Sequence, residues 1–242
     1  MCSGPVYDPL GGPGLHADVG PISMPITTLE TFDVEHGHGE ENRLRVGGVV
    51  LCGGESRRMG RPKAWLPLGD ETLLERVVRI ASTVVSPVVV ATRRGVDLPP
   101  LPAGVSVAFD VEESKGPLAG IAAGFDALAD HCDAAFVVAC DHALLTGAFI
   151  ARMIELLADH RAVVPECDGH VFPTVGVFRL DTRDVARKLL ADGEWRAKEF
   201  ALRCAARVVT RQDFADIDPG LHALRNINTP EDYREVLRIA AP

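Results

Sequence analysis

Two glycines and several cations follow an apolar segment near residue 50, and this combination suits the binding of nucleotide phosphates. Gly53 and Gly54 carry no Cβ, so the backbone there can approach an anion closely. Arg57, Arg58 and Lys63 bring three positive charges to the same turn. The spacing from glycine to lysine is not that of a Walker loop, and a Gly-x-Gly-x-x-Gly dinucleotide pattern is absent. We therefore expect a phosphate-binding loop of another kind.

A single carboxylate, Asp141, follows an apolar segment at 134–139 and precedes an expected helix. Its side chain should project from the carboxyl edge of a sheet. Magnesium in phosphate chemistry is held by one or two carboxylates together with substrate phosphates, so one aspartate suffices as a ligand. The structural alternative is that Asp141 caps the helix that begins near Thr146. We expect the neighbouring His142 to be an exposed loop residue without a role, although it could meet a phosphate.

Two further segments place polar groups beside expected strand ends. The sequence from Gly116 through Pro117 opens a helix whose N-terminal amides could receive a base or a phosphate, and simple helix initiation by Gly-Pro is the alternative. Near the carboxyl terminus, period-2 spacing puts Asn226 and Asn228 on one face of an extended segment. These asparagines could approach the metal or a second substrate, or they could serve as turn and cap residues for the final helix.

Together these motifs resemble those of a known family. The loop at 53–63, the Gly-Pro-Leu-Ala-Gly sequence at 116–120 and the Asn-x-Asn-Thr-Pro-Glu-Asp sequence at 226–232 are similar to nucleotidyltransferases with a glycosyltransferase-A-like Rossmann fold. The similarity is greatest to the molybdenum cofactor guanylyltransferases and covers about residues 46–240. It implies that Asp110 helps to hold the guanine nucleotide. It also implies that His170, in a His-x-x-Pro pattern, lies beside the pocket for the second substrate.

Two positions depart from the family's pattern. The segment at 140–143 reads Cys-Asp-His-Ala where the family usually has Cys-Asp-x-Pro, which lowers loop rigidity but removes no ligand atom. After the second strand the family often shows an asparagine, where this chain has Ala-Thr-Arg-Arg at 91–94. One nucleotide contact is therefore either absent or supplied by Thr92 or an arginine.

The resemblance implies Mg2+-dependent transfer of GMP from GTP to the phosphate of molybdopterin, with Arg58, Lys63 and a metal on Asp141 neutralising charge. The alternatives are a nucleotidyltransferase for another phosphorylated acceptor such as a sugar phosphate, a CTP-dependent molybdopterin cytidylyltransferase, and a non-catalytic nucleotide-binding module. Cofactor-biosynthesis proteins or molybdoenzyme chaperones could be protein partners. The expected nucleotide contacts are Leu51, Cys52, Gly53, Gly54, Lys63, Asp110, Gly116, Pro117, Leu118 and Asp141. The expected second-substrate contacts are Asn226, Asn228 and His170.

The order of apolar segments predicts an α/β fold. Expected strands at 46–51, 88–91, 105–109 and 134–139 alternate with expected helices at 72–82, 117–129 and 148–159, the first of them capped by Asp70. Further on we expect strands at 162–165, 171–179 and 208–209, a turn at 168–169, and helices at 183–190, 196–204 and from 230. The pattern predicts a single three-layer domain over residues 44–242 with a mostly parallel sheet, like that of nucleotide-diphospho-sugar transferases, and a site at the carboxyl ends of the strands.

Composition narrows the classes of function. Residues 1–45 hold seven carboxylates against two arginines, so this tail supplies −5 of the formal charge of −9. Such acidity argues against a duplex nucleic-acid partner. Residues 1–43, with scattered Gly, Pro, His and acid, are expected to form a disordered leader. No apolar stretch reaches the roughly 18 residues of a membrane span, and the six widely spaced cysteines are typical of reduced core thiols in a cytoplasmic protein.

Overall fold

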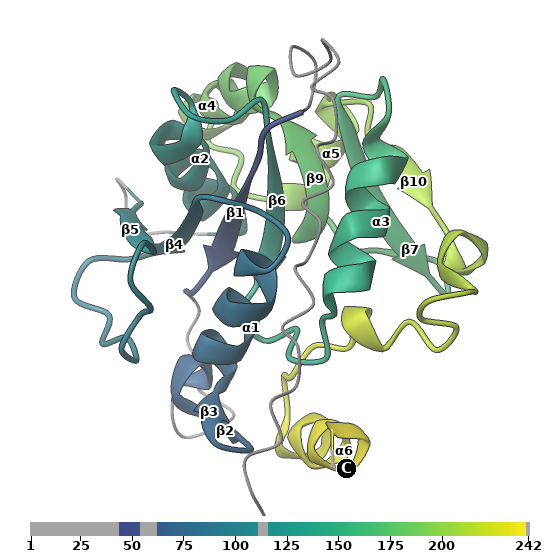
Figure 1. Cartoon of the computed structure of the whole chain (residues 1–242). Coiled ribbons are helices and arrows are strands. Elements are labelled where there is room, and N and C mark those ends of the chain that lie inside the picture. Colours follow the sequence, from purple (N-terminus) through teal and green to yellow (C-terminus); the bar gives the residue numbers. More distant parts are fainter. Residues whose placement is uncertain (1–43, 54–61, 111–115, 241–242) are drawn as a thin grey trace, which may run out of the picture. The chain divides into compact units, whose positions relative to one another are not determined.

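The computed structural model describes residues 44–53, 62–110 and 116–240, which fold around a central sheet (Figure 1). The strands of this sheet are β1 (Val46–Leu51), β4 (Val88–Thr92), β5 (Ser106–Phe109), β6 (Ala134–Ala139), β7 (Ala162–Cys167), β8 (His170–Val171), β9 (Val175–Arg179) and β10 (Arg207–Val209). Along the sheet the order is β10-β7-β9-β6-β1-β4-β5, with β8 paired to β7. β9 runs antiparallel to both β6 and β7, while β1, β4, β5 and β6 are parallel neighbours. The expected mostly parallel sheet is confirmed.

Helices cover both faces of this sheet. They are α1 (Leu73–Ser82), α2 (Pro117–Leu128), α3 (Gly147–Leu157), α4 (Arg183–Ala191), α5 (Ala197–Arg203) and α6 (Pro230–Ala240). Short 3-10 turns add η2 (Lys63–Trp65), η3 (Leu180–Thr182), η4 (Arg211–Phe214) and η5 (His222–Leu224). Figure 1 shows α1 and α3 in front of the strands.

The three layers follow from the alternation of side chains along each strand. Val50 of β1 points into a core shared with α1 and α3, whereas Val49 points into a second core shared with α2, α4 and α5. Both valines are fully buried. This burial on both faces explains why the strand is apolar throughout its length. The predicted three-layer α/β domain is confirmed for the described residues.

The start of α1 differs from the prediction. A small hairpin of β2 (Pro67–Leu68) and β3 (Glu71–Thr72) precedes the helix and places Asp70 in its turn. The cap is Thr72, whose hydroxyl accepts the amide of Glu75 at 3.3 Å, while the Glu75 carboxylate accepts the Thr72 amide at 2.7 Å. The assignment of the cap to Asp70 was therefore wrong, because the two-strand hairpin places the cap two residues later, at Thr72, and the helix begins at Leu73 rather than at residue 72.

The second half of the chain also differs in detail. The predicted turn at Asp168 and Gly169 is confirmed, and both residues have positive φ, 51° and 82°, as a two-residue primed hairpin requires. The single strand predicted at 171–179 is two strands: β8 ends at Val171 and pairs with β7, and β9 begins at Val175. Pro173 lies between them and has no amide to donate to a sheet.

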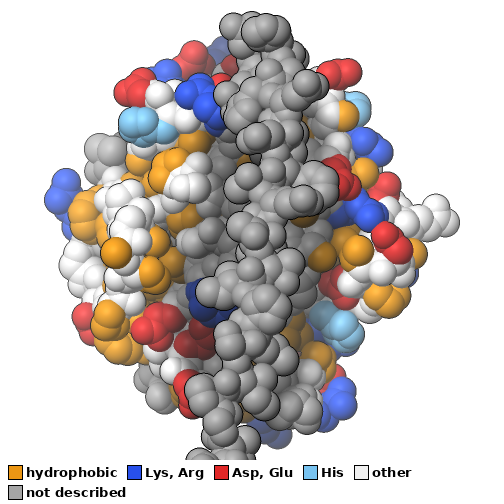
Figure 2. Space-filling model, in the orientation of Figure 1, with side chains coloured by type: hydrophobic (Ala, Val, Ile, Leu, Met, Phe, Trp, Pro, Cys, Tyr) orange, Lys and Arg blue, Asp and Glu red, His pale blue; other side chains and the backbone are white. Residues whose placement is uncertain are grey.

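The surface of the described residues carries both signs of charge. On the face seen in Figure 2, acidic and basic side chains are interspersed around the rim. Across the described segments, no helix is long and apolar enough to cross a membrane. The leader predicted for residues 1–43 lies outside the described residues.

Candidate active site

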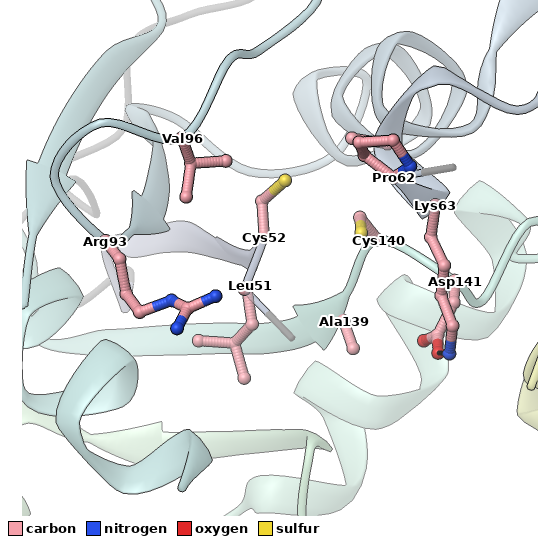
Figure 3. Close-up of a pocket in the computed structure, with 11 residues that line it drawn as sticks. Leu51, Cys52, Pro62, Lys63, Arg93, Val96, Ala139, Cys140 and Asp141 are labelled. Atoms are coloured by element: carbon pink, nitrogen blue, oxygen red, sulfur yellow. Dashed lines mark hydrogen bonds and ion pairs between the residues drawn. The ribbon is translucent and has the colours of Figure 1, made fainter. Parts of the chain in front are cut away.

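A pocket lies where β1, β4 and β6 end, at the carboxyl edge of the sheet (Figure 3). These three strands are adjacent and parallel, so their last residues and the loops that follow meet at one place. The short turn η2 returns the chain to the same edge after residues 54–61. The lining residues are Leu51, Cys52, Gly53, Pro62, Lys63, Ala64, Arg93, Val96, Ala139, Cys140 and Asp141.

One end of the pocket holds a three-residue polar network. The Lys63 ammonium donates to Asp141 Oδ2 at 2.8 Å and to Asn228 Oδ1 at 2.9 Å. These residues come from η2, from the loop after β6 and from the segment before α6. The side chains of Lys63 and Asp141 are only 21% and 14% exposed, so their attraction is screened less than that of a surface pair. In Figure 3 the Lys63 side chain runs down to the Asp141 carboxylate.

The Asp141 loop is held by bonds to η5 and to the segment that follows it. The amide of Ile227 donates to the Asp141 carbonyl at 3.3 Å, and Nδ1 of His142 lies 3.1 Å from the Ala223 carbonyl. His142 is 1% exposed and burial lowers its pKa, so the expectation of an exposed loop histidine was wrong. Its imidazole ties two loops together and thereby supports a turn that lacks proline.

The alternative role of Asp141 as a helix cap is also decided by the geometry. The cap of α3 is Thr146, whose hydroxyl accepts the amide of Phe149 at 3.2 Å. Asp141 instead keeps its carboxylate in the pocket, bonded to Lys63. A carboxylate left at an open strand edge is available to a cation or to a phosphate-bound metal.

The oxygens at this end fit a hard cation. Asp141 Oδ2 and Asn228 Oδ1 converge within 2.9 Å on one positive charge, the Lys63 ammonium. Carboxylate and amide oxygens are the donors that Mg2+ and Ca2+ accept. Across the described segments, no group of three or more His, Cys, Asp or Glu side chains could hold a metal ion. The donor set therefore suits a metal that completes its coordination with substrate phosphates rather than one held by a protein cage.

Comparison with known proteins decides the family. The MobA-like NTP transferase domain matches residues 48–207. The chain belongs to the MobA-like NTP transferase family. It is 34% identical over 204 residues to a probable molybdenum cofactor guanylyltransferase of Mycobacterium ulcerans, covering 82% of this chain and 96% of the relative. It is 32% identical over 192 residues to a molybdenum cofactor guanylyltransferase of Desulfosudis oleivorans, covering 78% and 93% respectively.

Solved structures show the same fold at lower sequence identity. The crystal structure of molybdopterin-guanine dinucleotide biosynthesis protein A from Archaeoglobus fulgidus has a TM-score of 0.64 and 22% identity, covering 80% of this chain and 97% of that one. The 2-C-methyl-D-erythritol 4-phosphate cytidylyltransferase from Thermus thermophilus has a TM-score of 0.59 and 20% identity, covering 79% and 97%. The fold is thus shared by MobA-like NTP transferases and cytidylyltransferases.

The structure brings together some of the site residues that the sequence predicted. Leu51, Cys52, Gly53, Lys63 and Asp141 line the pocket of this MobA-like NTP transferase domain. Asn228 joins them through Lys63. Gly54 and Arg58 lie outside the described residues. Among the described residues, the predicted ones that do not line the pocket are Asp110, Gly116, Pro117, Leu118, His170 and Asn226, which lie on neighbouring elements.

Asp110 lies along the same edge, beyond β4, whereas the first turn of α2 lies beside Leu51 and Ala91 at the ends of β1 and β4. The Asp110 amide donates to the Thr92 carbonyl at 3.1 Å, which continues the parallel pairing of β4 with β5. At α2, the Leu118 amide donates to the Trp195 carbonyl at 3.3 Å and the Leu118 side chain is fully buried. The amide and the side chain of Leu118 are therefore both engaged within the protein, and the nucleotide contacts predicted for Gly116, Pro117 and Leu118 stay predictions.

His170 and Asn226 share the carboxyl edge with Asp141. β7 is parallel to β6, because both pair antiparallel with β9, so the hairpin that carries His170 leaves the sheet on the side where β6 ends. In that hairpin region, Phe172 packs edge-on against His142 with ring centroids 6.4 Å apart. Asn226 is exposed and Ile227 is fully buried, which confirms the alternation predicted for Asn226 and Asn228.

Two cysteines form part of the pocket wall. Cys52 and Cys140 follow paired positions of β1 and β6, and both are buried. A hydrogen bond from the Cys140 thiol lowers the pKa of Cys52, and the same bond together with burial raises the pKa of Cys140. Cys132 and Cys204 are also buried free thiols, as predicted, whereas Cys167 is half-buried.

Some pocket residues were not assigned from the sequence. Pro62, Ala64, Val96, Ala139 and Cys140 complete the wall, and they are apolar or weakly polar. Pro62, Ala64 and Cys140 each adjoin a predicted ligand, whereas Ala139 ends β6 and Val96 lies four residues beyond β4, where no motif marked it. Arg93 also lines the pocket. The sequence left the contact after the second strand open between Thr92 and an arginine, and Thr92 is absent from the lining residues.

Proposed function

We propose that this protein transfers GMP from GTP to the phosphate of molybdopterin and releases pyrophosphate. Membership of the MobA-like NTP transferase family supports a nucleotidyl transfer, and the relatives named molybdenum cofactor guanylyltransferase support this donor and acceptor. The observation that carries the proposal is the bonding of Lys63 to both Asp141 and Asn228 at the open sheet edge. This bonding supports the proposal because it brings together a lysine after the glycine-rich loop, the carboxylate proposed to hold the metal, and the carboxyl-terminal motif.

The chemistry asks the protein for position and charge. A phosphate oxygen of molybdopterin attacks the α-phosphorus of GTP, and the bond from that phosphorus to the oxygen of the β-phosphate breaks. The phosphate nucleophile is already ionised at neutral pH, so no general base is required. Catalysis consists of aligning the two phosphates and neutralising the charge on the leaving pyrophosphate.

Lys63 is the described side chain best placed to neutralise that charge. Its ammonium is bonded and partly buried before any ligand arrives, so its position is preorganised. Arg58 is proposed as a second cation from the sequence of the loop. Asp141, assisted by Asn228, is proposed to hold Mg2+. When bound there, Mg2+ would supply positive charge to the donor phosphates.

The other predicted residues are given roles by their position on the edge. Leu51, Cys52, Gly53 and Gly54 are proposed to follow the nucleotide along β1, with Asp110, Gly116 and Pro117 on the side of its base. Asn226 and His170 are proposed to meet molybdopterin. We also propose a cytoplasmic setting, where GTP is available and buried thiols stay reduced, and contact with cofactor-biosynthesis proteins or molybdoenzyme chaperones that accept the product.

A product assay tests the proposal. The protein is incubated with molybdopterin, Mg2+ and GTP, CTP or ATP in turn, and the products are identified by mass spectrometry. The expected product is the guanine dinucleotide, formed with GTP in clear excess over the other nucleotides. The matched control is Asp159→Asn, an exposed carboxylate outside the pocket, which should behave like the wild type, whereas Asp141→Asn should not.

A cytosine dinucleotide formed in preference would instead identify a cytidylyltransferase. Binding of GTP without any dinucleotide product would identify a nucleotide-binding module.

A further inference from the structure

Two successive arginines after β4 point in different directions. Arg93 lines the pocket, and Figure 3 shows its guanidinium extending toward Leu51. Arg94 is exposed and lies over the ring of Phe109, 5.0 Å from its centroid, on the edge strand β5. Arg93 can therefore contact a ligand in the pocket, whereas Arg94 packs against Phe109 on the surface.

The inward arginine carries an unsatisfied group. Nε of Arg93 is buried and has no hydrogen-bond partner among the residues that the structure describes. A buried donor without a partner destabilises a protein, because its hydration is lost and nothing replaces it. A ligand with an acceptor at this place would remove that penalty. Thr92 Oγ1 is likewise buried without a partner, but Thr92 does not line the pocket.

The position of Arg93 separates it from the phosphate end. Asp141 follows β6 and Arg93 follows β4, with β1 between them. Because neighbouring strands are about 4.8 Å apart, these two strand ends lie roughly 10 Å from each other. Leu51 and Val96 line the pocket near Arg93. A nucleotide with its phosphates at Lys63 and Asp141 would therefore lay its flat, largely apolar base toward Arg93.

We infer that Arg93 selects guanine by donating to O6 and N7 of the base. A guanidinium presents two parallel N–H groups, and guanine offers two acceptors at matching separation on this edge. Adenine presents an N6 amino donor in place of O6, so the same arginine would face a donor and lose one bond. The inference rests on the proposed function and deepens it, since it names the residue that reads the base.

The neighbour on β5 is consistent with this placement of the base. Thr92 and Phe109 are the last paired residues of β4 and β5. Arg93 and Asp110 are the residues that follow them, so Asp110 lies beside Arg93 where the two strands end. A carboxylate accepts hydrogen bonds, and the remaining edge of guanine carries N1–H and the 2-amino donors. Arg93 and Asp110 would thus meet opposite kinds of group on one base, as the keto and amino groups of guanine require.

The test measures binding of nucleotides with Mg2+ and without molybdopterin, by calorimetric titration. GTP, 7-deaza-GTP and ATP are compared on the wild type, Arg93→Met, Arg93→Lys and the matched control Arg94→Met. In the wild type, 7-deaza-GTP, which has C–H in place of N7, should bind about tenfold more weakly than GTP. Arg93→Met should weaken GTP binding about 10- to 100-fold, because two bonds are lost, and should weaken ATP binding by no more than about tenfold, because adenine offers the arginine only N7. Its binding of GTP and 7-deaza-GTP should become equal, while Arg94→Met keeps the wild-type pattern.

Arg93→Lys distinguishes the base from a phosphate as the partner. A lysine keeps the charge but not the planar fork, so it should not restore the preference for GTP over ATP. If Arg93→Met weakened GTP and ATP equally, or if Lys restored full binding, Arg93 would be a phosphate ligand and the inference would be overturned.

The wild type alone also tests the inference, whatever the variants' stability. Equal binding of GTP and 7-deaza-GTP would exclude an N7 contact. If the wild type prefers GTP and Arg93→Met keeps that preference undiminished, this inference fails while the proposed function stands. If the wild type shows no preference for GTP, the guanylyl specificity of the proposed function fails as well.

Discussion

The two ends of the pocket differ in how their cations are bonded. At one end Lys63 is bonded to Asp141 and Asn228, and the Asp141 loop is itself tied to the segment around Ile227. At the other end Nε of Arg93 is buried without a partner among the described residues. The first end is assembled by the protein alone. The second end is completed only when a ligand supplies the acceptors.

This difference separates two tasks that one nucleotide imposes. Charge neutralisation at the phosphates must be in place before the reaction, because a preorganised charge does not have to be reoriented as the transition state forms. Selection of a base requires a group that is left unsatisfied until the ligand binds. A base with the matching acceptor then gains binding free energy at this donor, and a base without that acceptor does not. Variants at the two ends should therefore change different quantities: rate at the Lys63 end and nucleotide preference at the Arg93 end.

Removing Lys63 should have the largest effect. Lys63→Ala deletes the ammonium that links Asp141 to Asn228, and loss of one preorganised charge lowers kcat by about 100- to 1000-fold. Added Mg2+ should not restore the rate, because the metal cannot occupy the position of the lysine and its own at once. Turnover is measured by pyrophosphate release, with the exposed Lys188→Ala of α4 as the control. A loss of less than about threefold in Lys63→Ala would show that the network is structural.

Changing Asp141 should separate the metal from the lysine. Asp141→Asn keeps the shape of the side chain but replaces an anionic oxygen by a neutral one, so the rate at low Mg2+ should fall by about 100-fold. Unlike Lys63→Ala, this variant should regain part of its rate as Mg2+ is raised. The protein should stay folded with only a modest fall in thermal midpoint, because the asparagine amide oxygen can still accept from the Lys63 ammonium. Full activity of Asp141→Asn at low Mg2+ would place the metal elsewhere.

Asn228 should contribute less than either charged partner. Asn228→Ala removes one hydrogen bond to the Lys63 ammonium, and loss of a bond to a charged group lowers the rate by about tenfold. Asn226, two residues away on the same face, is the matched position: Asn226→Ala should raise the KM for molybdopterin and leave kcat nearly unchanged. Equal losses of kcat in both variants would mean that the segment acts through the second substrate rather than through Lys63.

The sequence was sufficient to predict the end of the pocket that contains motif residues. Three local patterns fell where expected. They are the continuously apolar strand β1, the glycine-rich loop that begins at Gly53, and Asp141 after β6, the neighbour of β1 in the sheet. The alternation of exposed Asn226 and Asn228 with buried Ile227 was also predictable, because period-2 spacing fixes the faces of an extended segment.

The remaining features depend on contacts between distant parts of the chain. Burial of His142 comes from packing against Ala223 and Phe172, 81 and 30 residues away, and no local pattern encodes it. Which of Thr92 and Arg93 enters the pocket depends on how β4 ends relative to β1 and β5. The cap at Thr72 could have been read from the capping-box spacing of Thr72 and Glu75, but Asp70 was an equally acceptable cap until the hairpin at 67–72 was known.

Gly116 and Gly53, both near the site, differ in the space around the position of a Cβ atom, so alanine substitutions should affect them differently. A Cβ on Gly116 would lie 2.4 Å from the Trp195 carbonyl oxygen, so Gly116→Ala should destabilise the fold by about 1–3 kcal/mol, roughly 2–10 °C in the thermal midpoint. A Cβ on Gly53 would meet no atom of the described residues within 4 Å, so Gly53→Ala should leave the midpoint unchanged.

The same pair of variants tests whether the space at Gly53 serves the nucleotide. Gly53 lines the pocket, and an added methyl group should weaken GTP binding measurably although the protein stays as stable as the wild type. Gly116→Ala supplies the reverse comparison, with a lower midpoint. Unaltered GTP affinity in Gly53→Ala would show that the nucleotide leaves this space empty.

The smallest effect is expected at the turn that supports Trp195. The Glu194 carboxylate accepts the amides of Trp195 and Arg196 and pairs with the Arg196 guanidinium, which lowers the pKa of Glu194 to about 2. The folded state therefore binds this proton less readily than the unfolded chain, whose glutamate titrates near its ordinary value of 4.5. The stabilisation is present above pH 4.5 and is lost as the pH falls from 4.5 toward 2.

Glu194→Gln should show this as a pH-dependent difference in thermal midpoint from the wild type. The difference in thermal midpoint should be constant from pH 7 to pH 5. It should shrink between pH 4.5 and 3.5, because the wild type there begins to lose the stabilisation from the charged carboxylate, which the variant lacks at every pH. Because the pair is close to solvent, the difference should be small and should decrease in high salt. Glu199→Gln, which breaks an ion pair with Arg203 on α5, is the control for loss of a carboxylate. If the difference for Glu194→Gln stays constant down to pH 3.5, the effect comes from the shape of the side chain and not from its charge. The turn at Trp195 would then be held mainly by the hydrogen bond from the Leu118 amide to the Trp195 carbonyl.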